Sequence, residues 1–278
     1  MIELSNQIRD LRLPYRPDQL PCLQAILSGA SKRALVICLG GKGGVGKTMA
    51  ASQVADVYAS AGHVLAIDAD PANQHFYKGL MRELPSGSRE YTPRLATVHA
   101  ITHRLRAEDH AGRIDPTACQ DLMELIQDAS DPYIIVDCPA GDTETTQRCS
   151  EIIIESCRES DIRLVVAVTV GAVDPTPIDV LRDLEFLLSQ ADRSVLVKNT
   201  AQAVNFTYIE RSDIYAKLNG LPNFREIQIA KIGERIIEGL RLGNIPWHTL
   251  ATETPMRIRV EAARLRQEYH QLWLEALK

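Results

Sequence analysis

The sequence predicts an α/β fold built on a doubly wound, mostly parallel sheet flanked by helices. Three observations support this prediction. From residue 34 onward, short runs rich in Val and Ile alternate with longer amphipathic segments, which is the rhythm of βα units. Those runs are continuously apolar, as in strands that are buried on both faces. A glycine-rich segment, Gly41–Thr48, separates the first run from the first helical segment, which is where such folds place a phosphate-binding loop.

The expected strands share this high content of Val, Ile and Leu. In chain order they are Ala34–Leu39, Val64–Ile67, Ala96–Ile101, Tyr133–Val136, Leu164–Val170, Val195–Val197 and Glu226–Ala230. Amphipathic segments such as Lys47–Ala61 and Thr117–Gln127 are expected to be the connecting helices. No linker divides residues 34–278, so we expect them to form one domain.

The beginning of the chain has a different character. Residues 1–33 contain three prolines, mixed charges and one short apolar run, Leu23–Leu27. We interpret them as an N-terminal arm with room for one helix, and packing on the domain surface is its simplest role. The first ten residues lack the apolar stretch of a signal peptide, so the expected location of the protein is cytoplasmic.

Composition and cysteine spacing exclude several classes of function. The formal net charge of −5 gives no global basic field that would draw the protein onto nucleic acid or an anionic membrane, although a local basic patch stays open. None of the six cysteines forms a C-x-x-C pair, which argues against zinc and iron–sulfur sites and favours reduced, buried thiols. The longest apolar stretch, near Leu164–Val173, is too short to span a membrane.

The strongest signal is the segment GKGGVGKT at Gly41–Thr48, which fits G-x-x-x-x-G-K-[ST]. Its glycines let backbone N–H groups close on phosphate oxygens, and the following helix N-terminus adds donors and a favourable dipole. Lys47 is expected to reach the β- and γ-phosphates of ATP, and the Thr48 hydroxyl to ligate Mg²⁺. A glycine-rich turn without a ligand is the alternative. The expected nucleotide-binding residues of this region are Gly41, Lys42, Gly43, Gly44, Val45, Gly46, Lys47, Thr48 and Met49.

Carboxylates follow two of the other expected strands. Asp68 and Asp70 follow the second strand, and Asp137 follows the fourth. Ligands bind at this edge of open α/β sheets, and an aspartate that closes an apolar strand suits a Mg²⁺ site. The expected metal ligands are therefore Thr48, Asp68 and Asp137. For Asp70, a helix N-cap for the segment that starts near Asn73 is the alternative.

With Lys42 as a second lysine, KGGVGKT resembles the deviant Walker A motif of the ParA/MinD superfamily of P-loop ATPases, which belong to the SIMIBI type. The resemblance implies that Lys42 reaches across a nucleotide sandwich dimer to the partner's phosphates, as an arginine finger does. A solvated loop lysine is the alternative. DADPANQ, at 68–74, resembles the switch I of this family, in which the second aspartate, here Asp70, helps to position the attacking water.

Two further features extend the resemblance. DCPAG, at 137–141, is similar to switch II of the MinD branch, in which Gly141 can swing its N–H towards the γ-phosphate. Asn199 ends the sixth expected strand and resembles the residue that reads the adenine edge, since a side-chain amide both donates and accepts; a surface asparagine is the alternative. Asp142 has no role in the family pattern. Cys138 is not expected to act as a ligand or nucleophile, because the adjacent Asp137 raises its pKa.

The last segment, Met256–Leu277, is expected to be one long helix packed against the sheet. Its apolar stripe comprises Ile258, Ala262, Leu265, Tyr269 and Leu272. Interleaved glutamates argue against a membrane-surface helix. Arg259 and Arg266 share one flank, and they are the candidates for a DNA-binding face of the kind found in ParA-type proteins.

The resemblance covers the chain from Ala34 to its end. Within the superfamily the chain is most similar to the orphan ParA-like ATPases of conjugative plasmids, the TraL type. This similarity rests on the Leu-Gly before the loop, on D-x-D-P-x-N-x-x-F ending at Phe76, and on the arginine-bearing last helix. The family's frequent I-P-R segment is altered here at 229–231, to Ile-Ala-Lys, which puts an inherited dimer contact there in doubt.

The resemblance implies an ATP-dependent homodimer that hydrolyses ATP slowly, with Lys42, Lys47, Asp70 and Mg²⁺ carrying the catalysis. It also implies a partner protein that acts as an activator or cargo adaptor. The ATPase would position, partition or assemble a cargo, such as plasmid DNA or a transfer complex. Non-specific DNA is a candidate partner, and a membrane is not expected. The alternatives are an assembly or regulatory factor without DNA binding, a metabolic P-loop synthetase and an iron–sulfur reductase.

Overall fold

The computed structural model describes residues 33–70, 73–83, 91–171, 176–201, 203 and 205–278. Pro71 and Ala72 of the expected switch I, and all of the expected N-terminal arm except Arg33, lie outside the described residues. The division into an arm and one domain therefore stays a prediction. Within the described part of the chain, no helix combines the length and the apolar character that crossing a membrane requires.

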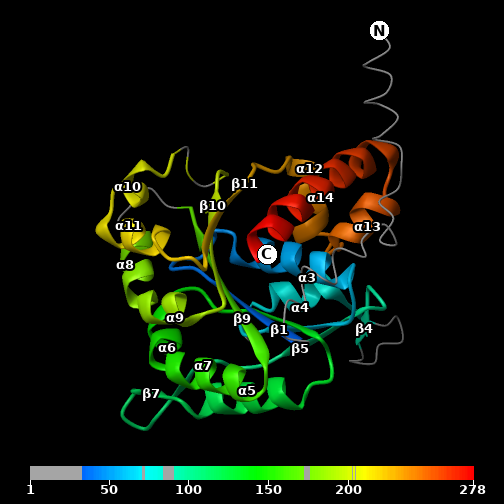
Figure 1. Cartoon of the computed structure of the whole chain (residues 1–278). Coiled ribbons are helices and arrows are strands. Elements are labelled where there is room, and N and C mark those ends of the chain that lie inside the picture. Colours follow the sequence, from blue (N-terminus) through cyan, green and yellow to red (C-terminus); the bar gives the residue numbers. More distant parts are fainter. Residues whose placement is uncertain (1–32, 71–72, 84–90, 172–175, 202, 204) are drawn as a thin grey trace.

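Seven parallel strands form the central sheet, in the order β11-β10-β9-β1-β8-β2-β5 (Figure 1). Every strand expected from the sequence is present, and the predicted doubly wound α/β fold is confirmed. Their bounds are β1 (Arg33–Leu39), β2 (Val64–Asp68), β5 (Val98–Thr102), β8 (Tyr133–Asp137), β9 (Ile162–Val170), β10 (Arg193–Asn199) and β11 (Phe224–Ile229).

Strand β1 lies between β8 and β9, and its side chains alternate between two cores. Val36 and Cys38 pack into the core on one face of the sheet, whereas Leu35 and Ile37 pack into the core on the other face. All four side chains are buried. Because both faces are covered, every position of the strand must be apolar, and this explains the continuous apolar runs of the sequence.

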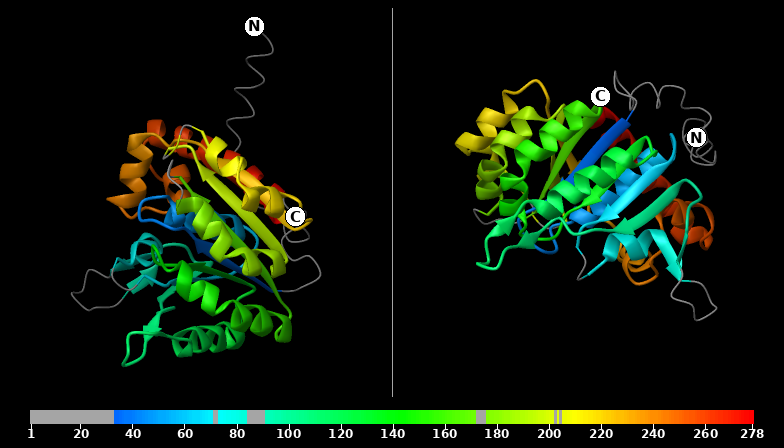
Figure 2. Two further views of the ribbon diagram at one scale, coloured as in Figure 1. Left: turned by 90° about the vertical axis from the view of Figure 1, so that its left-hand side faces the viewer. Right: turned by 90° about the horizontal axis from the view of Figure 1, so that it is seen from below.

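Helices cover both faces of the sheet (Figure 2). One face carries α3 (Lys47–Ala59), α4 (His75–Leu80), α12 (Glu234–Arg241), α13 (Trp247–Thr252) and α14 (Met256–Leu277). The other face carries α5 (Thr117–Asp128), α6 (Thr143–Arg148), α7 (Ser150–Glu159), α8 (Thr176–Asp183), α9 (Glu185–Gln190), α10 (Thr207–Glu210) and α11 (Asp213–Asn219).

Two short antiparallel hairpins were not expected from the sequence. The strand β3 (Met81–Glu83) pairs with β4 (Tyr91–Pro93), and β6 (Ala107–Glu108) pairs with β7 (Ile114–Asp115). These strands have two or three residues each and are mostly polar, so they lack the apolar pattern by which a strand is recognised in a sequence.

The last helix, α14, has the bounds that the sequence predicts, and most of the expected apolar stripe is buried, with Leu272 as the exception. Leu265 and Tyr269 are buried as expected, whereas Leu272 is 38% exposed and Trp273 is fully buried. The expectation that Arg266 contributes to a DNA-binding face is wrong, because its side chain is buried against Asp56 of α3. The physical reason is that α14 packs on α3 and α13 as well as on the sheet, and α3 offers a carboxylate there.

Candidate nucleotide-binding site

The phosphate loop connects the C-terminal end of β1 to the N-terminus of α3, as the motif requires. Gly44 and Gly46 have φ angles of 80° and 105°, in the left-handed region that favours glycine. A Cβ atom on Gly46 would lie 2.4 Å from Asn199 Nδ2, and a Cβ atom on Gly41 would lie 2.4 Å from Val180 Cγ2 of α8. The glycines thus let the loop turn tightly against both neighbours, with Gly43 and Gly44 on the exposed side.

The two lysines of the loop lie in different environments. The Lys47 side chain is 7% exposed, and its Nζ lies 3.5 Å from the backbone oxygen of Lys42, so it folds back over the loop. Lys42 itself is exposed on the outer side of the loop. Val45 is buried below the loop, and Met49 lies half-buried one residue beyond Thr48.

Thr48 and Asp137 meet at the foot of the loop. The Thr48 hydroxyl donates a hydrogen bond of 2.6 Å to Asp137 Oδ2. Asp137 ends β8 in parallel register with Asp68 at the end of β2, so the sheet places both carboxylates at one edge. Burial raises the pKa of Asp137 to about 7, and the charge of Asp68 acts in the same direction, while the Thr48 hydrogen bond and the charge of Lys47 oppose this.

These residues fit a magnesium ion. Asp137 Oδ1 is buried and has no hydrogen-bond partner among the described residues, and a buried carboxylate oxygen requires a donor or a cation. The described part of the chain has no cluster of three or more His, Cys, Asp or Glu residues that could hold a metal ion. A metal at this edge would therefore rely on Thr48, Asp137 and phosphate or water oxygens, which is the usual mode for Mg²⁺.

Asp68 and Asp70 organise the start of the segment that leads into α4. Asp68 is 1% exposed, and its carboxylate accepts hydrogen bonds from the N–H groups of Asp70, at 3.0 Å, and Tyr77, at 2.9 Å. Burial raises the pKa of Asp68, and these hydrogen bonds oppose the rise. The Asp70 carboxylate accepts from the N–H and the side-chain amide of Asn73. In this arrangement Asp70 stabilises the turn before α4, but it is not the N-cap that the alternative expects, because Gln74 holds that position.

Gly141 and Asp142 lie where switch II is expected. Gly141 has a φ of 75°, and a Cβ atom there would lie 3.9 Å from the backbone oxygen of Gly41, so it is next to the phosphate loop. The Asp142 side chain is buried, where Thr145 Oγ1 donates to it and Arg106 Nη1 lies 3.8 Å away. Cys138, between the switch and β8, is buried, and burial followed by the charge of Asp137 raises its pKa.

Asn199 lies behind the phosphate loop and is 8% exposed. Its Nδ2 donates to the Val45 backbone oxygen at 2.8 Å, and its Oδ1 accepts from the Ala201 N–H at 3.1 Å. The side chain therefore braces the loop, and one amide hydrogen remains for a ligand. The adjacent Lys198, which sequence reasoning did not single out, is 1% exposed and pairs with Glu210 and Glu226 at 2.6 and 2.7 Å.

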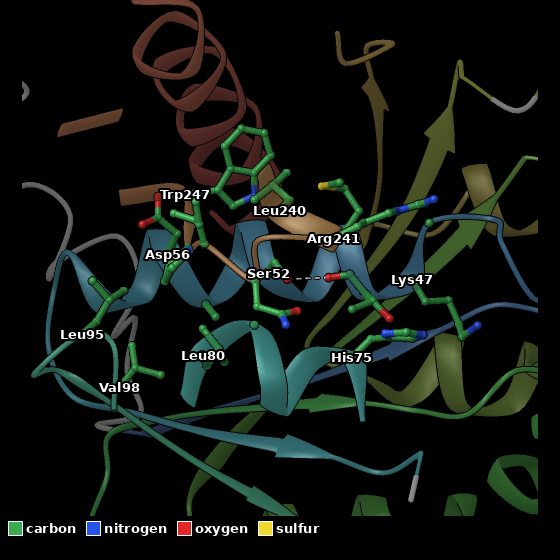
Figure 3. A pocket seen from close by; sticks show the side chains of 18 of the residues that line it. Lys47, Ser52, Asp56, His75, Leu80, Leu95, Val98, Leu240, Arg241 and Trp247 are labelled. Carbon is green, nitrogen blue, oxygen red and sulfur yellow. Dashed lines mark hydrogen bonds between the residues drawn. The ribbon is translucent and has the colours of Figure 1, made fainter. Parts of the chain in front are cut away.

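A pocket that sequence reasoning did not anticipate opens beside the phosphate loop (Figure 3). Its volume is about 490 Å³, and it runs along α3 between α4 and the α12–α13 connection. Lys47 and Thr48 line one end, and Asp56 and Trp247 line another part of its wall. The residues that form it come from four segments of the chain, at 44–56, 75–80, 95–98 and 240–247, so no local motif could have revealed it.

A family of known proteins matches more than half of the chain, including the phosphate loop. Residues 36–207 match the family model of the CobQ/CobB/MinD/ParA nucleotide binding domain. A search of curated proteins found no match.

Among solved structures, the chain is similar to a ParA family ATPase from Chlorobium tepidum TLS, with 15% identity, a TM-score of 0.45, and coverage of 84% of this chain and 97% of that one. It is also similar to the MinD cell division protein of Aquifex aeolicus, with 21% identity, a TM-score of 0.42, and coverage of 84% and 97%. For a plasmid partition protein from Borrelia burgdorferi the values are 11% identity, a TM-score of 0.40, and coverage of 88% and 99%.

Proposed function

The chain belongs to the CobQ/CobB/MinD/ParA nucleotide-binding family, and from this membership we propose that it hydrolyses ATP to ADP and phosphate with Mg²⁺ as cofactor. The observation that carries the proposal is the 2.6 Å hydrogen bond from Thr48 to Asp137 at the foot of the phosphate loop. It brings together a hydroxyl and a carboxylate, the two protein groups with which P-loop ATPases hold Mg²⁺.

Each residue of the site then has a role in the reaction. Mg²⁺, when bound, neutralises charge on the phosphates. Thr48 and Asp137 hold the ion, with Asp68 beside them, and Lys47 places its ammonium on the β- and γ-phosphates. Asp70 orients the water that attacks the γ-phosphate. The protein does little covalent chemistry, and catalysis comes from positioning and charge stabilisation.

Lys42 acts across a dimer in this proposal. It is exposed at the mouth of the loop, where a second copy can approach, and a cation from the partner stabilises charge in the transition state as an arginine finger does. KGGVGKT is then a deviant Walker A motif, and ATP promotes the homodimer. One amide hydrogen of Asn199 donates to the Val45 backbone oxygen, and the other donates to the edge of the adenine base.

The output of the cycle is the positioning, partition or assembly of a cargo, with plasmid DNA or a conjugative transfer complex as the preferred cargo and a TraL-like role in conjugation. A protein activator or adaptor stimulates the slow hydrolysis. Because Arg266 is buried, only the exposed arginines of α14 can contact DNA. One of these, Arg264, is already paired with Glu268. Arg257 and Arg259 are thus the arginines of α14 to test first.

Two experiments test the proposal. Release of phosphate from ATP in the presence of Mg²⁺ tests the activity. Binding of the full chain to a non-specific DNA duplex, compared with ATP, with ADP and without nucleotide, tests the role. ATP-dependent, salt-sensitive binding that Arg257→Gln and Arg259→Gln weaken is the expected result. DNA binding that is absent in every nucleotide state would contradict the DNA cargo and favour the assembly of a protein complex.

A further inference from the structure

The pocket beside the phosphate loop has the size and character of a small-molecule site. Its volume of about 490 Å³ falls in the range of roughly 300–1,000 Å³ that is typical of ligand pockets. Apolar side chains such as Leu80, Val98, Leu240 and Ile245 form most of its walls. Ligand sites combine such walls with a few polar groups that fix the orientation of the ligand, so the polar groups of this pocket decide what it can bind.

Trp247 provides an unsatisfied hydrogen-bond donor in the wall. Its side chain is 2% exposed, and its indole N–H has no hydrogen-bond partner among the described residues. In Figure 3 the indole lies on the wall of the pocket opposite Leu80, with the ring nitrogen towards the pocket. By contrast, the equally buried Trp273 donates its indole N–H to Gln53 at 3.1 Å. Leaving a buried donor unpaired is costly, so a ligand with an acceptor would gain from meeting Trp247.

The charges around the pocket favour an anion at one end. Arg241 is exposed at the rim near Lys47, and no ion pair to it is found in the described part of the chain (Figure 3). His75 lies on the opposite rim (Figure 3). The carboxylate in the wall, Asp56, is already paired with Arg266 at 2.6 Å, so it does not repel an anion strongly. A carboxylate on a ligand would find its complement at Arg241.

The shape of the pocket sets the form of the ligand. Lys47 and Asp56, both in its lining, are nine residues apart on α3, which corresponds to about 14 Å at the rise of an α-helix. We propose that this pocket binds a small acylated carboxylate: an anionic group at Arg241, a carbonyl that accepts from Trp247, and an apolar chain along Leu80 and Val98. This site adjoins the ATP site, since Lys47 and Thr48 line one end of the pocket, but binding of the acylated carboxylate does not depend on the proposed hydrolysis.

The probe for the test is N-octanoylglycine, which has an acyl chain, an amide carbonyl and a carboxylate. Its uncharged analogue, N-octanoylglycinamide, is the matched control ligand. Titrated by calorimetry into the nucleotide-free full chain, N-octanoylglycine is expected to bind with a Kd of about 100 µM, as its size allows. The amide should bind about threefold more weakly, because the charge of Arg241 acts at an exposed rim. Tryptophan fluorescence should change with the same Kd.

Variants identify the donor. Trp247→Phe keeps the ring and removes the N–H, so it should weaken binding of N-octanoylglycine about fivefold. Trp273→Phe, which removes the satisfied N–H, should leave the Kd unchanged. Arg241→Gln, at the exposed rim, should make the acid and the amide bind equally. Thermal unfolding of each variant shows that it is folded before it is titrated, and Arg241→Gln keeps the proposal testable if a tryptophan variant does not fold.

Three results would overturn the proposal. The first is a lack of binding of N-octanoylglycine up to about 1 mM. The second is an unchanged Kd in both Trp247→Phe and Arg241→Gln. The third is complete displacement of the probe by saturating ADP with Mg²⁺, which would mean that the nucleotide itself fills the pocket. Because the probe is titrated without nucleotide, a failure here leaves the hydrolysis of ATP untouched, and a failure of hydrolysis leaves this binding to be measured.

Discussion

Arg266, in the last helix, and Asp56, in the helix that follows the phosphate loop, form a buried ion pair in which Arg266 Nε lies 2.6 Å from Asp56 Oδ2. Tyr269 and His270 donate to the same oxygen. Burial alone would raise the pKa of Asp56, but the hydrogen bond from His270 and the charge of Arg266 outweigh it and hold that pKa well below its usual range. The pair fixes α14 on α3, two turns beyond Thr48.

Removing the carboxylate should therefore cost much stability. Asp56→Ala leaves Arg266 buried without a counter-charge, and we expect the free energy of unfolding to fall by about 3–5 kcal/mol, measured by urea unfolding. The control is Glu268→Ala, which breaks the exposed ion pair with Arg264 and should cost less than about 1 kcal/mol. Equal, small losses in the two variants would contradict the buried pair.

The same cluster predicts a loss of stability in acid. Burial lowers the pKa of both His270 and His248, with Arg266 acting in the same direction and Asp56 opposing. As the pH falls below about 6.5, these histidines are protonated in the unfolded chain before they are protonated in the folded protein. The free energy of unfolding therefore falls below that pH, by up to about 1.4 kcal/mol per pH unit for each histidine. His270→Gln should roughly halve the slope, measured by urea unfolding between pH 8 and pH 5.5. An unchanged slope would contradict this assignment.

Asn199 should support both the loop and the nucleotide. Asn199→Ala leaves the Val45 oxygen without its donor, and we expect a loss of about 1–2 kcal/mol in the free energy of unfolding together with weaker ATP binding. If the amide also reads adenine, the preference for ATP over GTP falls, measured by competition binding. Asn219→Ala, at an exposed position in α11, serves as the control. Equal weakening of ATP and GTP would leave Asn199 as a brace alone.

Lys42 separates a dimeric ATPase from an enzyme that works as a single copy. Lys42→Ala should bind ATP within about threefold of the wild type and release phosphate at least about 100-fold more slowly, as expected for a cation supplied across a dimer. Lys217→Ala, in the exposed face of α11, should turn over normally. Wild-type turnover in Lys42→Ala would rule out the role in trans and favour a synthetase-like use of the fold.

The sheet could be predicted from the sequence because each of its strands is buried on both faces. Every residue of Ala34–Leu39, for example, must then be apolar, and a continuous run of this kind leaves a clear pattern. Two site residues could also be predicted from the sequence, because Thr48 is the last residue of the phosphate-loop motif and Asp137 directly follows an expected strand. Their contact follows from the parallel register of the sheet.

The features that could not be predicted from the sequence depend on packing between helices that are far apart in the chain. Arg266 looked like a surface residue because its partner, Asp56, lies 210 positions away in the chain. The pocket at Trp247 and Arg241 depends on how α12 and α13 lie over α3, and no local pattern encodes that arrangement. Asn199 was recognised at the end of its strand, but the bond to Val45 that braces the loop became visible only in three dimensions.

The most direct test of the central claim is phosphate release from ATP by the full chain, with Mg²⁺ and with EDTA, for the wild type and for Lys47→Ala. We expect slow, Mg²⁺-dependent release by the wild type and none above background in the variant, which loses the cation on the β- and γ-phosphates. Release at the same rate in Lys47→Ala, or none by the wild type with or without a DNA duplex, would contradict the proposal that this site hydrolyses ATP.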